Sequence, residues 1–84
     1  ASRARAASVA RATLQTLGER LGGGPAGALA DALPPELGRY LRPAASAAGE
    51  TFGADEFLAR VAERADLERD EAVRAVRAVV DQLA

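Results

Sequence analysis

The apolar residues of this chain recur every three or four positions, and no segment sustains an alternation of apolar and polar residues. A period near 3.6 lines up side chains along one side of an α-helix, whereas a half-buried strand requires a period of two. The spacing therefore predicts an all-α fold. We expect a small bundle of four to five short helices in a single domain, residues 1–84.

Glycine and proline divide the first half into helices. We expect the first helix over residues 4–21, ended by Gly22–Gly24 and Pro25, because glycine suits a helix C-cap and proline cannot continue the helix. A short helix over residues 25–33 precedes Pro34-Pro35, and Pro35 can open another helix that runs to about Leu41. The predicted inward stripe of the first helix is Ala7, Ala10, Leu14, Leu17 and Leu21.

The second half is predicted to hold a connector and two helices. Residues 42–53 are interpreted as a loop, or as a frayed helix end followed by a connector. Residues 54–65 are interpreted as a helix, and Asp66 as the N-cap of the last helix. The first of these helices is expected to turn inward Phe57, Leu58, Val61, Ala62 and Ala65. The last is expected to turn inward Ala72, Val73, Val76, Val79, Val80 and Leu83. Residues 7–21 and 69–83 form a weak internal repeat of apolar positions.

The composition argues against catalysis and metal binding. The chain has no His and no Cys, which removes the usual acid–base group near neutral pH, the thiolate nucleophile and the common zinc ligands. The glycines at 22–24 lack the Lys-Ser/Thr of a phosphate loop, and the acidic residues between 63 and 71 lack the spacing of a calcium loop. We expect no enzyme activity, no catalytic residue, no cofactor and no metal.

No run of about 20 apolar residues or signal core occurs, so we expect no membrane contact and, by default, a cytoplasmic protein. All 11 basic residues are Arg, a bias typical of a GC-rich bacterial genome. The chain starts without Met, which suggests a piece of a longer protein.

Charge is distributed unevenly along the chain. Residues 1–49 hold six Arg and three acidic residues, whereas residues 50–84 hold five Arg and nine acidic residues. A basic half and an acidic half suit head-to-tail assembly, so the expected partner is a protein, and that protein could be a second copy. A weak nucleic-acid module is the alternative. Its contacts would be Arg3, Arg5, Arg11 and Arg20, with Arg39 and Arg42 after the prolines.

Four segments together resemble a known family. They are "LQTLGERL", "LADALPPELGRYL", "FGADEFLARVAERADL" and "DEAVRAVRAVVDQL". In this order the chain resembles the bacterial family catalogued as domain of unknown function 2267, which looks built from tandem helical modules. The resemblance implies a helical fold and no activity. The chain departs from the family by lacking an aromatic-rich stretch after the Leu33-Pro34 segment.

The function predicted is a non-enzymatic helical module for protein interaction or assembly. Its predicted partner surface is Arg39, Tyr40 and Arg42, which follow Pro34-Pro35 directly. Tyr40, Phe52 and Phe57 are expected mainly to fill space between helices rich in Ala and Val, and Tyr40 is the aromatic residue most suited to touch a partner. No small-molecule substrate is evident.

Overall fold

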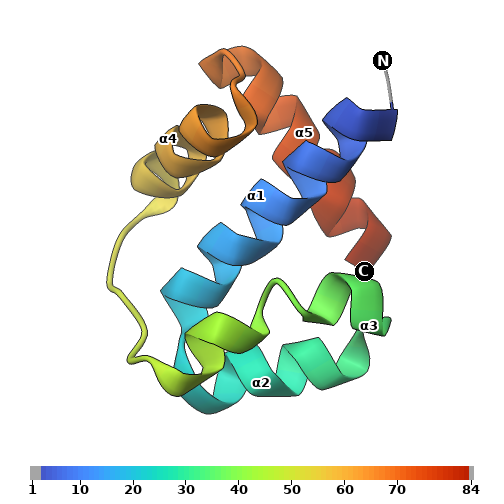
Figure 1. Cartoon of the computed structure of the whole chain (residues 1–84). Helices are drawn as coiled ribbons and strands as arrows, with labels where there is room; N and C mark the ends of the chain where they lie inside the picture. The colour runs from blue at the N-terminus through green and yellow to red at the C-terminus, as the bar shows by residue number, and fades with distance from the viewer. Residues whose placement is uncertain (1–2, 84) are drawn as a thin grey trace. The chain divides into compact units, whose positions relative to one another are not determined.

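The chain folds entirely into helices over the part that the structure describes. A computed structural model describes residues 3–83, and the side chains of residues 5–81. This part holds five α-helices and one 3₁₀ helix without a strand, which confirms the all-α prediction (Figure 1). The elements are α1 (Arg3–Leu21), α2 (Gly23–Ala32), α3 (Pro35–Gly38), η1 (Arg42–Ser46), α4 (Ala54–Ala65) and α5 (Arg69–Leu83).

The helices group into two compact units. Unit 1 comprises residues 1–13 and 53–84, and unit 2 comprises residues 14–52. The helix α1 therefore contributes its first part to unit 1 and its last part, from Leu14 on, to unit 2. Each unit is described by itself below, and the expectation of a single domain stays a prediction.

Unit 1 is held by side chains of amphipathic helices. Its core is formed by α1, α4 and α5, and Val61 of α4 is completely buried in it. Phe57 packs against this core, as predicted for an aromatic residue that fills space. The predicted bounds of α4 are confirmed, and so is the inward position of four of its five predicted residues. The core residues are Val9, Ala12, Val61, Ala65 and Ala72.

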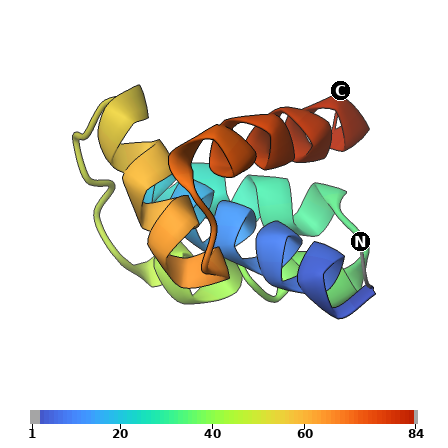
Figure 2. The ribbon, with the colours of Figure 1, turned by 90° about the horizontal axis from the view of Figure 1, so that it is seen from above.

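The turn between α4 and α5 corrects the prediction for Asp66. This residue ends α4 in the left-handed conformation, with φ 56°, instead of starting α5. Leu67 N–H donates to Ala62 O at 2.8 Å across this end, a pattern that closes a helix C-terminus. The next helix starts later, where a Glu71 carboxylate oxygen accepts from Glu68 N–H at 3.1 Å. Seen from above, the two helices run in different directions from this turn (Figure 2).

The buried side of α1 differs from the predicted stripe. Ala7 is exposed and Leu21 is 37% exposed, whereas Leu14 is buried as predicted. The helix buries other residues instead, including two threonines outside the predicted stripe. Threonine carries a methyl group and fits where helices approach closely, so the spacing of Ala and Leu alone did not indicate this face. The buried residues of α1 are Val9, Ala12, Thr13, Leu14, Thr16 and Gly18.

Unit 2 follows the predicted glycine and proline breaks. The helix α1 ends where Gly22 adopts φ 62°, and α2 begins at the next residue. Pro34, in an extended conformation, precedes α3, and Pro35 is the first residue of that helix, as predicted. Of the two alternatives for residues 42–53, the structure favours a helical segment followed by a connector, because Arg42–Ser46 form a 3₁₀ helix. In Figure 1 this helix lies beside α2, and the contacts between them dominate the unit.

Backbone segments in unit 2 approach one another closely at glycines. A Cβ atom on Gly22 would lie 2.2 Å from the backbone nitrogen of Gly49, and one on Gly38 would lie 2.5 Å from the carbonyl oxygen of Ala30. Gly23 N–H also donates to Ala47 O at 2.7 Å, which joins the start of α2 to the segment after η1. Unit 2 is therefore packed through main-chain contact at positions where a side chain does not fit.

Candidate functional site

The predicted partner surface lies in unit 2, at the end of α3 and the start of η1. Arg39 Nη2 donates to Tyr40 Oη at 3.1 Å, and the guanidinium carbon lies 5.1 Å from the centroid of the Tyr40 ring. The hydrogen bond to Tyr40 raises the pKa of Arg39 above its ordinary value. The two side chains thus hold each other, and Leu41, which is completely buried, anchors the backbone behind them.

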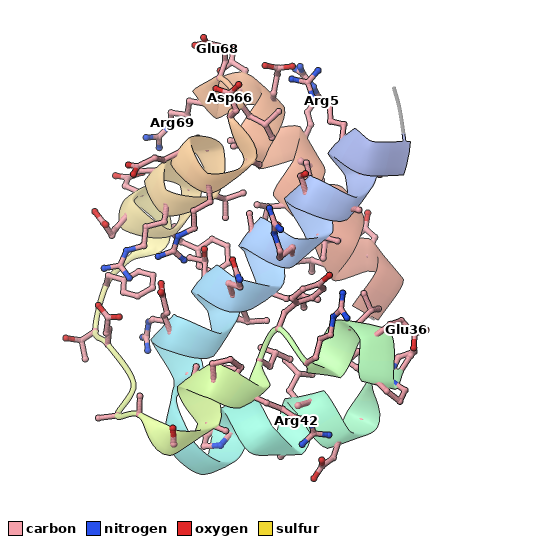
Figure 3. The ribbon with its side chains drawn as sticks, in the orientation of Figure 1. Arg5, Glu36, Arg42, Asp66, Glu68 and Arg69 are labelled. Atoms are coloured by element: carbon pink, nitrogen blue, oxygen red, sulfur yellow. The ribbon has the colours of Figure 1, made fainter. Side chains whose placement is uncertain are left out.

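Arg42, the third predicted residue, contacts α2 instead of its neighbours. Its Nη2 lies 3.2 Å from Asp31 Oδ1, and both side chains are largely exposed. Figure 3 labels the Arg42 side chain. Surface ion pairs of this kind contribute little and exchange readily with water. The three residues therefore present one cation stacked on an aromatic ring and a second cation paired with an exposed aspartate.

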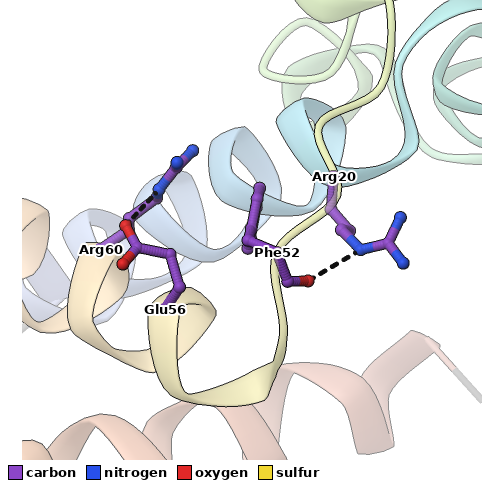
Figure 4. Close-up of polar contacts among 4 residues, drawn as sticks. All are labelled: Arg20, Phe52, Glu56 and Arg60. Carbon is purple, nitrogen blue, oxygen red and sulfur yellow. Dashed lines mark hydrogen bonds and ion pairs between the residues drawn. The ribbon is translucent and has the colours of Figure 1, made fainter.

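The arginines predicted for the nucleic-acid alternative are divided between the two units. The side chain of Arg3 lies outside the described residues. Arg5 and Arg11 are six positions apart on α1, so they point about 120° away from each other. Arg20 belongs to unit 2, where its Nε donates to Phe52 O at 3.0 Å (Figure 4).

The charge halves of the sequence are mixed by folding. Unit 1 combines the basic start of α1 with the acidic helices α4 and α5, and it contains eight Arg and eight acidic residues. Unit 2 holds three Arg and four acidic residues. Local pairs add to this balance, including Arg69 with Asp55 at 2.6 Å and Arg60 with Glu56 at 2.9 Å, the latter drawn in Figure 4. Charge asymmetry along the sequence therefore no longer supports head-to-tail assembly.

An open depression of about 400 Å³ lies on unit 1. Its polar members are Arg5, Glu71 and Arg74, and Glu71 already accepts the hydrogen bond that starts α5. Sites for small molecules usually bury most of the ligand, which this open surface does not do. The residues that line the depression are Arg5, Val9, Leu67, Glu71, Arg74 and Ala75.

An exposed apolar surface on α5 corrects the predicted inward face. Val73 is 40% exposed and Val80 is 52% exposed, although both were expected inside. Each directly follows a residue that does face the core, Ala72 and Val79, and successive residues lie about 100° apart around a helix. One helix cannot turn both flanks toward the same neighbours. Val76 packs against the core as predicted, and the side chain of Leu83 lies outside the described residues.

We define the α5 flank as Asp70, Val73, Arg77 and Val80. All four residues are exposed, and they fall within about 80° of arc around the helix. Neither Asp70 nor Arg77 has an ion-pair or hydrogen-bond partner among the described side chains. The signal in the sequence was the width of the apolar arc, since valines at 73 and 80 extend it beyond what neighbouring helices can cover.

Two further observations limit the chemistry of the described part. Residues 5–81 contain no cluster of three or more acidic side chains arranged to hold a metal ion. Over the same part, the helices are too short or too polar to cross a bilayer.

These helices define a small all-α protein. In a comparison with models of known protein families, the whole chain, residues 1–84, matches the family described as uncharacterized conserved protein (DUF2267). The chain belongs to this family, which confirms the resemblance drawn from its four segments. No curated protein and no solved structure matches the chain.

Proposed function

We propose that this chain is a non-enzymatic helical module that binds another protein through the α5 flank. The observation that supports the proposal is the exposure of Val73 and Val80 on one side of α5. Three large apolar side chains are exposed among the described residues, and two of them lie two helical turns apart on this flank. Paired apolar residues framed by charges are typical of a protein contact surface.

The absence of His and Cys from the sequence supports a role without catalysis. The composition, with Arg as the sole basic residue, supports a bacterial source, and we take the cytoplasm as the setting. Arg39, Tyr40 and Arg42 stay a second predicted partner surface, on unit 2.

Site-specific photocrosslinking in the producing cell tests the proposal. A photoreactive phenylalanine analogue is placed at Val80, at Tyr40, and at Ala78, an exposed residue about 140° to 160° around α5 from the two valines. We expect a discrete protein adduct from position 80 and none from position 78. Adducts from position 40 alone would indicate that the partner surface is on unit 2. Equal adduct yields from positions 80 and 78, or no adduct from either, would show that the α5 flank is not the partner surface.

The nucleic-acid alternative stays a prediction, and we do not put it forward. Arg5 and Arg11 diverge on α1, and Arg20 donates to Phe52 O. A phosphate binder gathers cations along one surface. A mobility-shift titration at low and moderate salt tests the alternative, and binding that weakens steeply with salt would revive it.

A further inference from the structure

The charges beside the exposed valines have a self-complementary order. Asp70 and Arg77 are seven residues apart, which is about two turns, or about 10 Å, along α5. Val73 lies between them on the same flank, and Val80 extends the apolar strip beyond Arg77. The flank therefore presents an acid, a valine, a base and a second valine in that order.

From this order we infer that the partner of the α5 flank is a second copy of this chain, bound with the two α5 helices antiparallel. The inference rests on the proposed function. A two-fold axis midway between Asp70 and Arg77 places Asp70 of each copy opposite Arg77 of the other. The same axis passes beside Val73, so the two Val73 side chains meet at the centre. One surface patch serves both copies, as two-fold contacts require.

The charges select this arrangement over the other way of pairing two α5 helices. In parallel pairing the Asp70 side chains of the two copies would face each other, as would the two Arg77 side chains. Both contacts would be repulsive. In the antiparallel register both ion pairs attract, and they use side chains that have no ion pair among the described residues. A partner of unrelated sequence would have no reason to need this order.

The contact is small, so its affinity is expected to be modest. It involves one helix per chain, and the charges lie at its edge, where salt screens them. We therefore expect association in the micromolar to millimolar range that weakens as salt is raised. Sedimentation equilibrium of the purified chain over a range of protein and salt concentrations measures this directly.

Two single charge reversals provide the decisive experiment. In Asp70→Arg, each new Arg faces Arg77 of the other copy, and in Arg77→Asp each new Asp faces Asp70. We expect each variant alone to associate at least tenfold more weakly than the wild type. Mixed together, they restore both attractive pairs, so the mixture is expected to form a one-to-one heterodimer. Circular dichroism checks that each variant keeps its helix content.

A matched pair of variants tests the apolar centre. Val73→Glu brings two like charges together at the axis and is expected to abolish association. Ala78→Glu, about 140° around α5 from Val73, is expected to leave it unchanged. A wild-type chain that stays monomeric at about 1 mM overturns the inference, because a Kd of that order would leave much of it associated. If the mixture of the two charge-reversal variants associates no more tightly than either variant alone, the proposed antiparallel register is wrong.

The outcomes separate this inference from the proposed function. If the purified chain is monomeric but position 80 crosslinks to a different protein in the cell, the second copy is the wrong partner and the interaction surface stands. If position 80 crosslinks only to residues of the same molecule, or to nothing, the flank is not a contact surface. Both the proposed function and this inference then fail.

Discussion

Units 1 and 2 are built from the same amino-acid types but are held together differently. In unit 1, amphipathic helices bury branched side chains such as Val9 and Val61. In unit 2, glycines allow backbone segments to touch, as at Gly22 with Gly49 and at Gly38 with Ala30. The comparison indicates that unit 1 should be sensitive to the loss of side-chain atoms and unit 2 to their addition.

The largest effect is expected from adding one methyl group to unit 2. Gly22→Ala combines a positive φ of 62° with a Cβ placed 2.2 Å from a backbone nitrogen, so neither strain nor clash can be relieved by a rotamer change. We expect a loss of about 3 kcal/mol or more in the free energy of unfolding, measured by urea denaturation.

Gly24→Ala is the matched control, two residues away. A Cβ at Gly24 meets no atom within 4 Å, and the residue lies in α2. Because Gly24 precedes Pro25, whose ring crowds a preceding Cβ in helical geometry, alanine should change the free energy of unfolding by about 1 kcal/mol or less. If both substitutions destabilise the chain to the same extent, close backbone packing does not distinguish unit 2.

Removing atoms from unit 1 should have the next largest effect. Val61 is completely buried, so Val61→Ala is expected to lower the free energy of unfolding by about 2 kcal/mol through lost burial and a residual cavity. Thermal and urea denaturation measure it. Val73→Ala removes the same atoms from the exposed flank and should change stability by about 0.5 kcal/mol or less. Similar losses at both sites would contradict a side-chain core centred on Val61.

Thr13 offers a stabilising change in the α1 helix. Its hydroxyl is buried without a hydrogen-bond partner, alone among the described side chains in this respect. Thr13→Val keeps the branched shape and removes the unpaired oxygen, so we expect a gain of about 1 kcal/mol in denaturation experiments. Thr16 is equally buried but takes part in an interaction, so Thr16→Val should give no gain. A loss at Thr13 would show that its hydroxyl does find a partner.

The smallest effect is expected from the exposed ion pairs, and it should be alike in the two units. Asp55 with Arg69 in unit 1 and Asp31 with Arg42 in unit 2 are both largely exposed. Double-mutant cycles with Asp→Asn and Arg→Gln should give coupling energies of about 0.5 kcal/mol or less, falling further in high salt. A coupling energy well above this value at either pair would mean that the ion pair contributes substantially to the stability of its unit.

Local signals in the sequence predicted the breaks of the fold better than its faces. Gly22, Pro34 and Pro35 act through their own backbone geometry, so they mark helix ends without knowledge of their neighbours. The face of α1 was missed because burial of Thr13 and Thr16 depends on what approaches the helix. Likewise, Asp66 carries the residue type of an N-cap, but the preceding helix uses it as a left-handed end.

The candidate site shows the same limit. The stacking of Arg39 on Tyr40 follows from adjacent residues, whereas the pairing of Arg42 with Asp31 requires the fold of unit 2. Val73 and Val80 of the α5 flank were assigned to the core, because an apolar pattern gives the direction of a face but not the width that neighbours can cover. Family membership was readable from four segments, since these carry the helix ends and apolar spacing together.

The glycine contacts of unit 2 also bear on how the family can diverge. Every amino acid reached from a glycine codon by one base change carries a Cβ atom, so positions 22, 38 and 49 have almost no neutral neighbour in the genetic code. Sequence drift should therefore leave these three glycines in place while Gly24 and Gly53, where a Cβ meets nothing within 4 Å, are replaced. In an alignment of relatives, the pattern of retained glycine would trace the backbone contacts of unit 2.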